Sequence, residues 1–174
     1  MEFRVALNHV DRKLEVEDAV IIARHPSETG EHLNLRVLAW CLLHEERLAF
    51  GPGLSDPEAA DLWTHDLTGR LTTWIECGTA TPDRLKRLVQ HNTGAQVHVV
   101  FGDERRRQEL LPAIAEWKRG QEALTVWTID QALVKALALH DERRHKWAAT
   151  IVGDHIYLDA DGEALDGAVS RDSW

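Results

Sequence analysis

One charged residue within an otherwise apolar run constrains the fold of this chain more than any other feature. Residues 35–43 read Leu-Arg-Val-Leu-Ala-Trp-Cys-Leu-Leu, so Arg36 is the only polar side chain that interrupts the run. A surface helix would separate polar and apolar faces at a period of about 3.6 residues, and this run does not. It therefore predicts a helix buried on all sides. We expect Arg36 to form an ion pair with an acid, and direct contact with a phosphate is the alternative.

Segments typical of strands and of helices alternate along the rest of the chain. A hairpin is expected over residues 3–9 and 14–22, followed by a helix over residues 28–44 with Ser27 as its N-cap. Further strands are expected at residues 47–50, 61–66, 71–76, 97–101, 124–129, 147–152 and 155–158, and further helices at residues 83–91, 103–118 and 130–140. Thr81 before Pro82 is the expected cap of the helix at 83–91, and Asp130 that of the helix at 130–140. No linker-like stretch divides these segments, which predicts one α/β domain over residues 1–174.

The charge of the chain argues against a protein that coats nucleic acid. The net charge is −9, whereas nucleic-acid binders usually carry a basic surface. Much of the negative charge lies in residues 154–174, which hold six acids and only one basic residue, Arg171. Short basic clusters occur elsewhere, and solvated helix faces explain each of them.

Other composition features point to the cytoplasm. No run approaches the ~20 apolar residues that a membrane helix needs, and the first twenty residues carry scattered charges. Cys41 and Cys77 are the only cysteines, and each is flanked by apolar or small residues. They therefore predict two reduced, buried thiols in a cytoplasmic protein without membrane contact.

The hairpin predicted over residues 61–76 brings two acids together. If residues 68–69 form a two-residue loop, Asp61 lies opposite Glu76 on one face, with Cβ atoms ~4.5–5.5 Å apart. Like charges at that separation destabilise a sheet unless a cation bridges them. A longer turn with Gly69 as a bulge would instead put the acids on opposite faces. Two solvent-exposed acids at the strand ends are a further alternative.

Several runs, in this order and spacing, resemble the YaeQ family. The runs are ARHPSET at residues 23–29, LAW at 38–40, ERL at 46–48, DLW at 61–63 and WIECG at 74–78. The HPSET run is the most specific of them, and the resemblance covers most of the chain. Because that family is grouped with the PD-(D/E)XK nuclease-like superfamily, the resemblance implies a restriction-endonuclease-like core. Such a core has a helix, a three-stranded meander, a second helix and a further strand, in a mixed central sheet flanked by helices.

The resemblance also implies a site. Asp61 matches the acid that ends one strand of the superfamily pattern, and Glu76 matches the acid of the (D/E)-x-K triplet on the next strand. The lysine of that triplet is absent, because Gly78 occupies its position. Some members carry the lysine on the following helix, where this chain offers Lys86 as the displaced lysine, with Arg84 beside it.

Four more residues are candidates for supporting roles. Glu31 or Glu28 resembles the additional acid on the first helix of the superfamily, and their spacing would place them on one face. First-turn acids that complement the helix dipole are the alternative. His25 either lines the cleft or forms a structural hydrogen bond at the start of the helix, and Arg36 would pair with one of the site acids.

The function implied by this resemblance is a phosphodiesterase or nuclease that depends on Mg²⁺ or Mn²⁺. Asp61 and Glu76 would be the metal ligands, with catalytic roles for Lys86 and Glu31. A non-catalytic binding or regulatory protein that retains the fold is the alternative, favoured by the net charge and the missing lysine. A nucleic acid or a small phosphorylated molecule would be the substrate, and the small molecule suits an acidic protein better.

Overall fold

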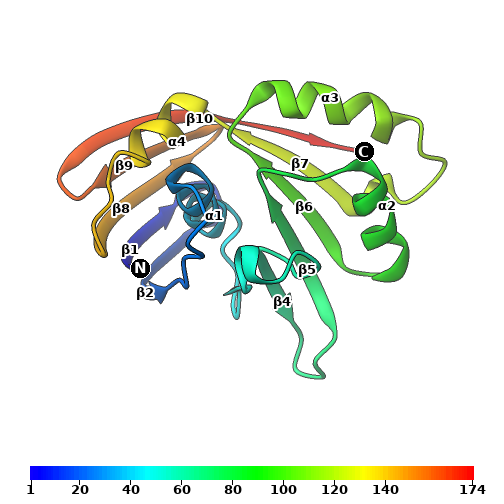
Figure 1. Ribbon diagram of the computed structural model, residues 1–174, viewed down its shortest axis with the longest axis horizontal. Helices are drawn as coiled ribbons and strands as arrows, with labels where there is room; N and C mark the ends of the chain where they lie inside the picture. The colour runs from blue at the N-terminus through cyan, green and yellow to red at the C-terminus, as the bar shows by residue number, and fades with distance from the viewer.

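The computed structural model describes residues 1–174 as a mixed α/β fold (Figure 1). Its strands are β1 (Glu2–His9), β2 (Leu14–Ile21), β3 (Ala49–Phe50), β4 (Leu62–His65), β5 (Leu71–Cys77), β6 (Gln96–Phe101), β7 (Leu124–Ile129), β8 (Arg144–Val152), β9 (His155–Ala160) and β10 (Glu163–Ser173). Its helices are α1 (Gly30–Leu43), α2 (Pro82–His91), α3 (Glu104–Ala115) and α4 (Gln131–Leu137), with short 3-10 turns η1 (Val10–Arg12), η2 (Gly53–Ser55) and η3 (Gln121–Ala123). None of the helices combines the length and the apolar composition needed to cross a membrane.

The strands form one continuous sheet in the order β2-β1-β8-β9-β10-β7-β6-β5-β4-β3. β1 is parallel to β8, and β5, β6 and β7 are parallel to one another, whereas the other neighbours are antiparallel. The mixed central sheet that the sequence predicts is therefore confirmed. In Figure 1 the sheet has two wings, one with β1, β2, β8 and β9 and one with β4 to β7, and α1 lies between them.

Buried apolar residues form two clusters, which lie on opposite faces of β5. The larger cluster joins α1 and α4 to β1, β8 and β9, and the smaller one joins α2 and α3 to β5, β6 and β7. Side chains along β5 alternate between them, because Trp74 belongs to the smaller cluster, and Ile75 and Cys77 to the larger. The end of β5 is therefore where the layers of α1 and α2 meet.

Helix α1 is the buried helix that the apolar run predicts. All residues of α1 in the range 33–42 are buried. The predicted N-cap was wrong, however, because the helix begins two residues later than expected. Thr29 caps it, and its hydroxyl accepts a hydrogen bond from the His32 amide at 3.1 Å, where Ser27 was expected.

A turn before α1 explains the late start. The Glu28 amide donates to the His25 carbonyl at 2.9 Å, and the Ser27 hydroxyl lies 2.7 Å from the His25 ring nitrogen Nδ1. Glu28 therefore precedes the helix and turns inward, where its side chain is buried. The helical spacing that would have placed it on one face with Glu31 does not apply.

The β4–β5 hairpin keeps the predicted register by an unexpected route. Leu62 pairs with Ile75, as the two-residue loop required. The loop itself is longer, since Gly69 has a φ of +82° and His65 pairs one residue out of step. A shift between Thr64 and His65 then restores the register. The longer loop and the shift between Thr64 and His65 compensate for each other, so residues 62–64 pair with β5 in the predicted register. The apolar side chains of both strands therefore keep their buried positions.

The longest strand, β10, was not predicted. Residues 159–174 are acidic and lack apolar alternation, and β10 buries only Gly167 and Val169. The strand pairs with β9 through residues 163–168 and with β7 through residues 169–173, so it joins the two wings (Figure 1). This polar segment becomes a strand because neighbours on both sides supply backbone hydrogen-bond partners.

Other helix boundaries follow their predicted caps. Thr81 caps α2 just before a proline, and Asp130 caps α4, as expected. Helix α3 continues through Pro112 but ends at Ala115, and α4 ends at Leu137, so both are shorter than predicted. The β1–β2 hairpin and β7 lie where the sequence placed them.

Candidate active site

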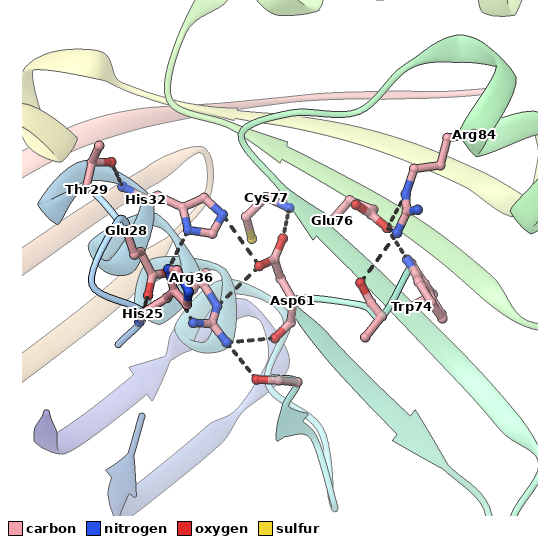
Figure 2. Close-up of polar contacts among 12 residues, drawn as sticks. His25, Glu28, Thr29, His32, Arg36, Asp61, Trp74, Glu76, Cys77 and Arg84 are labelled. Atoms are coloured by element: carbon pink, nitrogen blue, oxygen red, sulfur yellow. Dashed lines mark hydrogen bonds and ion pairs between the residues drawn. The ribbon is translucent and has the colours of Figure 1, made fainter. Parts of the chain in front are cut away.

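Four ionisable residues form a largely buried group, the α1 network, which consists of Glu28, His32, Arg36 and Asp61 (Figure 2). His32 and Arg36 are one helical turn apart on α1 and so face the same side. Glu28 Oε1 accepts hydrogen bonds from His32 Nδ1 at 2.7 Å and from Arg36 Nη1 at 3.2 Å. Neither Glu28 nor Arg36 exposes any side-chain surface. The network is therefore built on a buried carboxylate shared by two cations.

Arg36 connects α1 to the meander. Its Nη2 donates to the carbonyl oxygens of Gly51 at 2.9 Å and Asp61 at 3.4 Å, and its Nε lies 3.3 Å from Asp61 Oδ1. The predicted ion pair between Arg36 and an acid is confirmed, and two acids share it. Gly51 is required here, since a Cβ on it would lie 1.9 Å from the Ala60 carbonyl oxygen.

His32 bridges the two acids of the network. Its Nδ1 contacts Glu28, and its Nε2 lies 3.5 Å from Asp61 Oδ1. Burial alone would lower the pKa of His32, but hydrogen bonding to Asp61 and Glu28 outweighs burial and raises the pKa to about 9. Burial likewise opposes ionisation of Glu28, yet His32 and Arg36 hold the pKa of Glu28 below its usual value. His32 is therefore cationic at neutral pH.

A second group, the β5–α2 network, consists of Trp74, Glu76 and Arg84 (Figure 2). Glu76 Oε1 accepts three hydrogen bonds, from Trp74 Nε1 at 2.7 Å and from Arg84 Nη2 and Nε at 2.9 and 3.1 Å. Arg84 also lies 3.6 Å from the exposed Glu58. Burial raises the pKa of Glu76, although Arg84 and Trp74 act in the opposite direction.

The two networks meet at the end of β5. The Cys77 amide donates to Asp61 Oδ2 at 2.8 Å, and Glu76, the preceding residue, directs its side chain towards α2. Of the alternatives for the two acids, the structure shows side chains on opposite sides, because Asp61 precedes β4, donates its amide to the Ile75 carbonyl at 3.0 Å and turns towards α1. The charge of Asp61 still contributes to the raised pKa of Glu76, so the two carboxylates act on each other.

The two acids offer a hard divalent cation one free carboxylate oxygen, because Arg36 and the Cys77 amide already contact the two oxygens of Asp61. Carboxylate oxygens are the ligands that Mg²⁺ and Mn²⁺ prefer, and the donors to Glu76 all bind Oε1, which leaves Oε2 for a ligand. The charges of the two networks also balance without a metal, since three carboxylates face three cations: Glu28, Asp61 and Glu76 against His32, Arg36 and Arg84. The two networks therefore need no metal for neutrality.

Comparison with known families assigns the chain to one family. A family model described as YaeQ protein matches residues 1–168. The chain belongs to the YaeQ family. The uncharacterized YaeQ protein of Salmonella typhi is 32% identical over 150 residues, which span 86% of this chain and 81% of that protein. The corresponding protein of Escherichia coli (strain K12) is 28% identical over 171 residues, spanning 95% and 89%.

YaeQ proteins of known structure have a similar fold. The crystal structure of YaeQ from Pseudomonas syringae matches with a TM-score of 0.87 and 28% identity, covering 99% of this chain and 94% of that one. The YaeQ structure from Xanthomonas axonopodis pv. citri matches with a TM-score of 0.87 and 24% identity, covering 99% and 96%. The large mixed sheet is therefore shared with other YaeQ proteins.

Three predicted site residues of this YaeQ-family chain, Glu31, His25 and Lys86, lie outside both networks. Glu31 is exposed in the first turn of α1. His25 lies in the turn before α1, where its ring contacts the Ser27 hydroxyl and its amide donates to Glu28 Oε2 at 3.4 Å. The structural hydrogen bond expected for His25 as one alternative is present.

The cation that contacts Glu76 is Arg84. Lys86 is exposed on α2, two positions further along. Two positions correspond to about 200° around a helix, so Lys86 faces away from Glu76. Between the two basic residues that the sequence offered in place of the missing lysine, the helix geometry brings Arg84 to the acid.

His32 is the network residue that the sequence predictions missed. The signal for it is the spacing of Glu28, His32 and Arg36, which follow one another at intervals of four residues. Within α1 this spacing places His32 and Arg36 on one side, and Glu28 meets them because the turn before the helix directs its side chain inward. His32, four residues after Glu28 and four before Arg36, could therefore have been predicted as a member of the network.

Proposed function

We propose that this protein is a phosphodiesterase or nuclease that depends on Mg²⁺ or Mn²⁺. The observation that carries the proposal is the position of Asp61 beside the end of β5, where its carboxylate accepts a hydrogen bond from the amide of Cys77, the residue after Glu76. Arg36 contacts Asp61 and Arg84 contacts Glu76. The order α1, β3, β4, β5, α2, β6 also matches the order expected of a PD-(D/E)XK core. Asp61 and Glu76 hold the metal in this proposal, and Arg84 takes the place of the missing lysine.

Asp61, Glu76 and the cations that contact them then have defined tasks. The bound metal would neutralise the phosphate and lower the pKa of the attacking water. Arg36 and His32 position the Asp61 carboxylate, whose other oxygen is fixed by the Cys77 amide. Arg84 orients Glu76 and supplies positive charge next to it, where negative charge develops on a phosphate.

The charge of the chain favours a small substrate. A net charge of −9 repels long nucleic acids, whereas a short or small phosphodiester avoids most of that repulsion. Binding of a long nucleic acid would weaken steeply with salt, and binding of a small phosphodiester would not. We place the protein in the cytoplasm, since Cys41 and Cys77 are both free and buried.

The test combines metal binding with hydrolysis. Mn²⁺ and Mg²⁺ are titrated by calorimetry into the wild type, Asp61→Asn, Glu76→Gln and the matched control Glu109→Gln, an exposed acid on α3. All four proteins are then assayed on single- and double-stranded DNA and RNA and on bis(p-nitrophenyl) phosphate. We expect saturable metal binding and hydrolysis in the wild type and the control, and a loss of hydrolysis of about 100-fold or more in the folded site variants.

A non-catalytic binding or regulatory protein is the second candidate. The observation that favours it is the charge balance of the two networks, which needs no metal. If millimolar Mn²⁺ and Mg²⁺ do not bind the wild type, the hydrolytic proposal fails and this second candidate is favoured.

A further inference from the structure

A second group of potential metal ligands lies at the outer end of the wing formed by β1, β2, β8 and β9 (Figure 1). It consists of His140 and Glu142, in the connection between α4 and β8, and Asp161, in the turn between β9 and β10. One donor atom from each of these three residues lies within 4.8 Å of the other two. We call this group the β9–β10 cluster, and no residue of the α1 or β5–α2 network belongs to it.

Glu163 fixes the orientation and the tautomer of the His140 ring. The ring nitrogen Nε2 lies 3.0 Å from Glu163 Oε2, and because an ionised carboxylate only accepts, Nε2 is the donor. In the neutral ring Nδ1 then carries a lone pair, and it lies 3.9 Å from Asp161 Oδ2, which is too far for a hydrogen bond. Metal-binding histidines usually donate their second ring nitrogen to a carboxylate in this way. A cation between His140 Nδ1 and Asp161 Oδ2 would be stabilised by both atoms.

Asp161 is held in place from two sides. Its Oδ2 accepts a hydrogen bond from His145 Nδ1 at 2.8 Å, and its Oδ1 accepts one from the Lys146 amide at 2.6 Å. His145 is buried, and its ring stacks on Phe3 with the ring centres 4.6 Å apart. Each oxygen of Asp161 accepts one hydrogen bond and keeps a second lone pair for a metal. Asp161 therefore has the hydrogen-bonded support that carboxylate ligands of metals usually have.

Glu142 completes the β9–β10 cluster. Its side chain is exposed and forms no hydrogen bond or ion pair, so its carboxylate is free to turn towards the other two ligands. In a tetrahedral zinc site the ligand atoms lie ~2.0–2.2 Å from the metal and therefore about 3.4 Å from one another. The separation of 3.9 Å between His140 Nδ1 and Asp161 Oδ2 is close to this value. A small closing movement thus brings the three donors to the distances that zinc requires.

From these contacts we infer that His140, Glu142 and Asp161 bind a zinc ion, with a water molecule as the fourth ligand. An imidazole ligand favours Zn²⁺ over Mg²⁺, which prefers sites made of oxygen atoms alone. The ion would tie the α4–β8 connection to the β9–β10 turn and so stabilise this end of the sheet. The inference does not rest on the proposed hydrolytic activity, because the site shares no residue with Asp61 and Glu76.

Calorimetric titration of zinc chloride into the full chain, without an affinity tag, tests the inference. We expect one ion per chain, bound at least about 100-fold more tightly than Mg²⁺. The melting temperature should rise by about 5–10 °C at a Zn²⁺ concentration 100 times the Kd. His140→Ala and Asp161→Asn should each weaken binding at least about 100-fold, and asparagine tolerates the backbone φ of +57° at this position. Glu163→Gln, which changes the partner of His140, should weaken binding about tenfold.

Two matched controls separate this site from others. His155 Nε2 lies 2.7 Å from Asp166 Oδ2, so His155→Ala removes a similar histidine–carboxylate pair at the opposite end of β9. Glu76→Gln alters the candidate active site. Both variants should bind Zn²⁺ as the wild type does. His140→Ala should keep any hydrolytic activity of the wild type, so a failure of the zinc site and a failure of the proposed function are distinguishable.

Three results would overturn the inference. The first is the absence of saturable binding at about 0.1 mM Zn²⁺. The second is binding that His140→Ala and Asp161→Asn leave unchanged while circular dichroism shows both variants folded. The third is binding of several ions per chain that no single substitution weakens, which would mark adventitious binding by surface histidines. A loss of Zn²⁺ binding in Glu76→Gln alone would place the ion at the candidate active site and would also overturn the inference.

Discussion

The two ionic networks at the end of β5 differ in the burial of their side chains and in the number of partners that each charge has. In the α1 network, two cations share two carboxylates, and Glu28 and Arg36 have no contact with solvent. In the β5–α2 network, one arginine serves one carboxylate, and 17% of the Arg84 side chain is exposed. Water and Glu58 offer Arg84 alternatives that Arg36 does not have.

This difference separates structural from functional roles. A buried ion pair that loses one partner leaves a charge without solvation, whereas a partly exposed pair can be rescued by water. We therefore expect the α1 network to hold the fold together and to position Asp61. We expect the β5–α2 network to tolerate changes in its charge without unfolding of the protein, because Arg84 is partly exposed.

The largest effect should follow removal of the shared cation. Arg36→Met leaves Glu28 and Asp61 without their arginine and should lower the free energy of unfolding by about 3–5 kcal/mol. Arg84→Met should cost only about 1 kcal/mol, because Glu76 keeps Trp74 and can take up a proton. Urea denaturation of both variants measures the contrast, and equal losses would remove the distinction between the networks. Adding Glu28→Gln to Arg36→Met should recover part of the loss.

The next effect is a pH dependence carried by His32. Its pKa is raised to about 9 in the folded protein, from about 6.5 when unfolded. The stabilisation is therefore fully present below pH 6.5 and is lost as the pH rises through 9. The difference in unfolding free energy between the wild type and His32→Gln should shrink by about 2–3 kcal/mol between pH 6 and pH 10. Denaturation curves across this range check it, and a constant difference would contradict the contacts of His32 with the two acids.

A smaller effect of opposite sign is expected at Glu76. Burial raises its pKa, so ionising Glu76 costs more in the folded than in the unfolded protein, and stability falls as the pH rises through the raised value. Glu76→Gln removes this cost and should equal the wild type or exceed it by up to about 1 kcal/mol at pH 8. Glu28→Gln, measured beside it, should lose about 2–3 kcal/mol, because Arg36 then lacks its buried partner. A comparable loss in both would place Glu76 with the structural network.

The smallest effect should distinguish the two basic residues of α2. Lys86→Ala should change the unfolding free energy by less than about 0.5 kcal/mol, since the side chain is exposed and faces away from Glu76. If the proposed hydrolysis is observed, Arg84→Ala should lower its rate by about 100-fold and Lys86→Ala should not. The reverse result would restore Lys86 as the displaced lysine.

Local sequence signals predicted much of the fold. The apolar run of α1, the cap of α2 at Thr81 and the cap of α4 at Asp130 depend on side chains and backbone groups within one helical turn. The register of β4 and β5 was predicted from a two-residue loop, and Leu62 pairs with Ile75 as that prediction requires, even though the turn is longer than expected. Such features are decided by near neighbours and can be read without the rest of the chain.

The candidate site was predicted only in part. Asp61, Glu76 and Arg36 were singled out from spacing and resemblance, and the need of Arg36 for an acid followed from its apolar surroundings. The inward turn of Glu28 was not foreseen, because it depends on where a helix begins within a run of several possible caps. His32 was missed for the same reason, since its contact with Glu28 depends on the inward turn of the Glu28 side chain.

By itself, the sequence determined that a buried helix with one trapped cation forms the centre of the protein, and that acids flank the hairpin beside it. Only the tertiary structure decided which acid meets which cation, and that β10 becomes the strand joining the two wings. The physical reason is the distance along the chain between the residues that interact. Caps and apolar patterns act within a few residues, whereas ion pairs and a polar strand depend on partners that folding brings from distant parts of the chain.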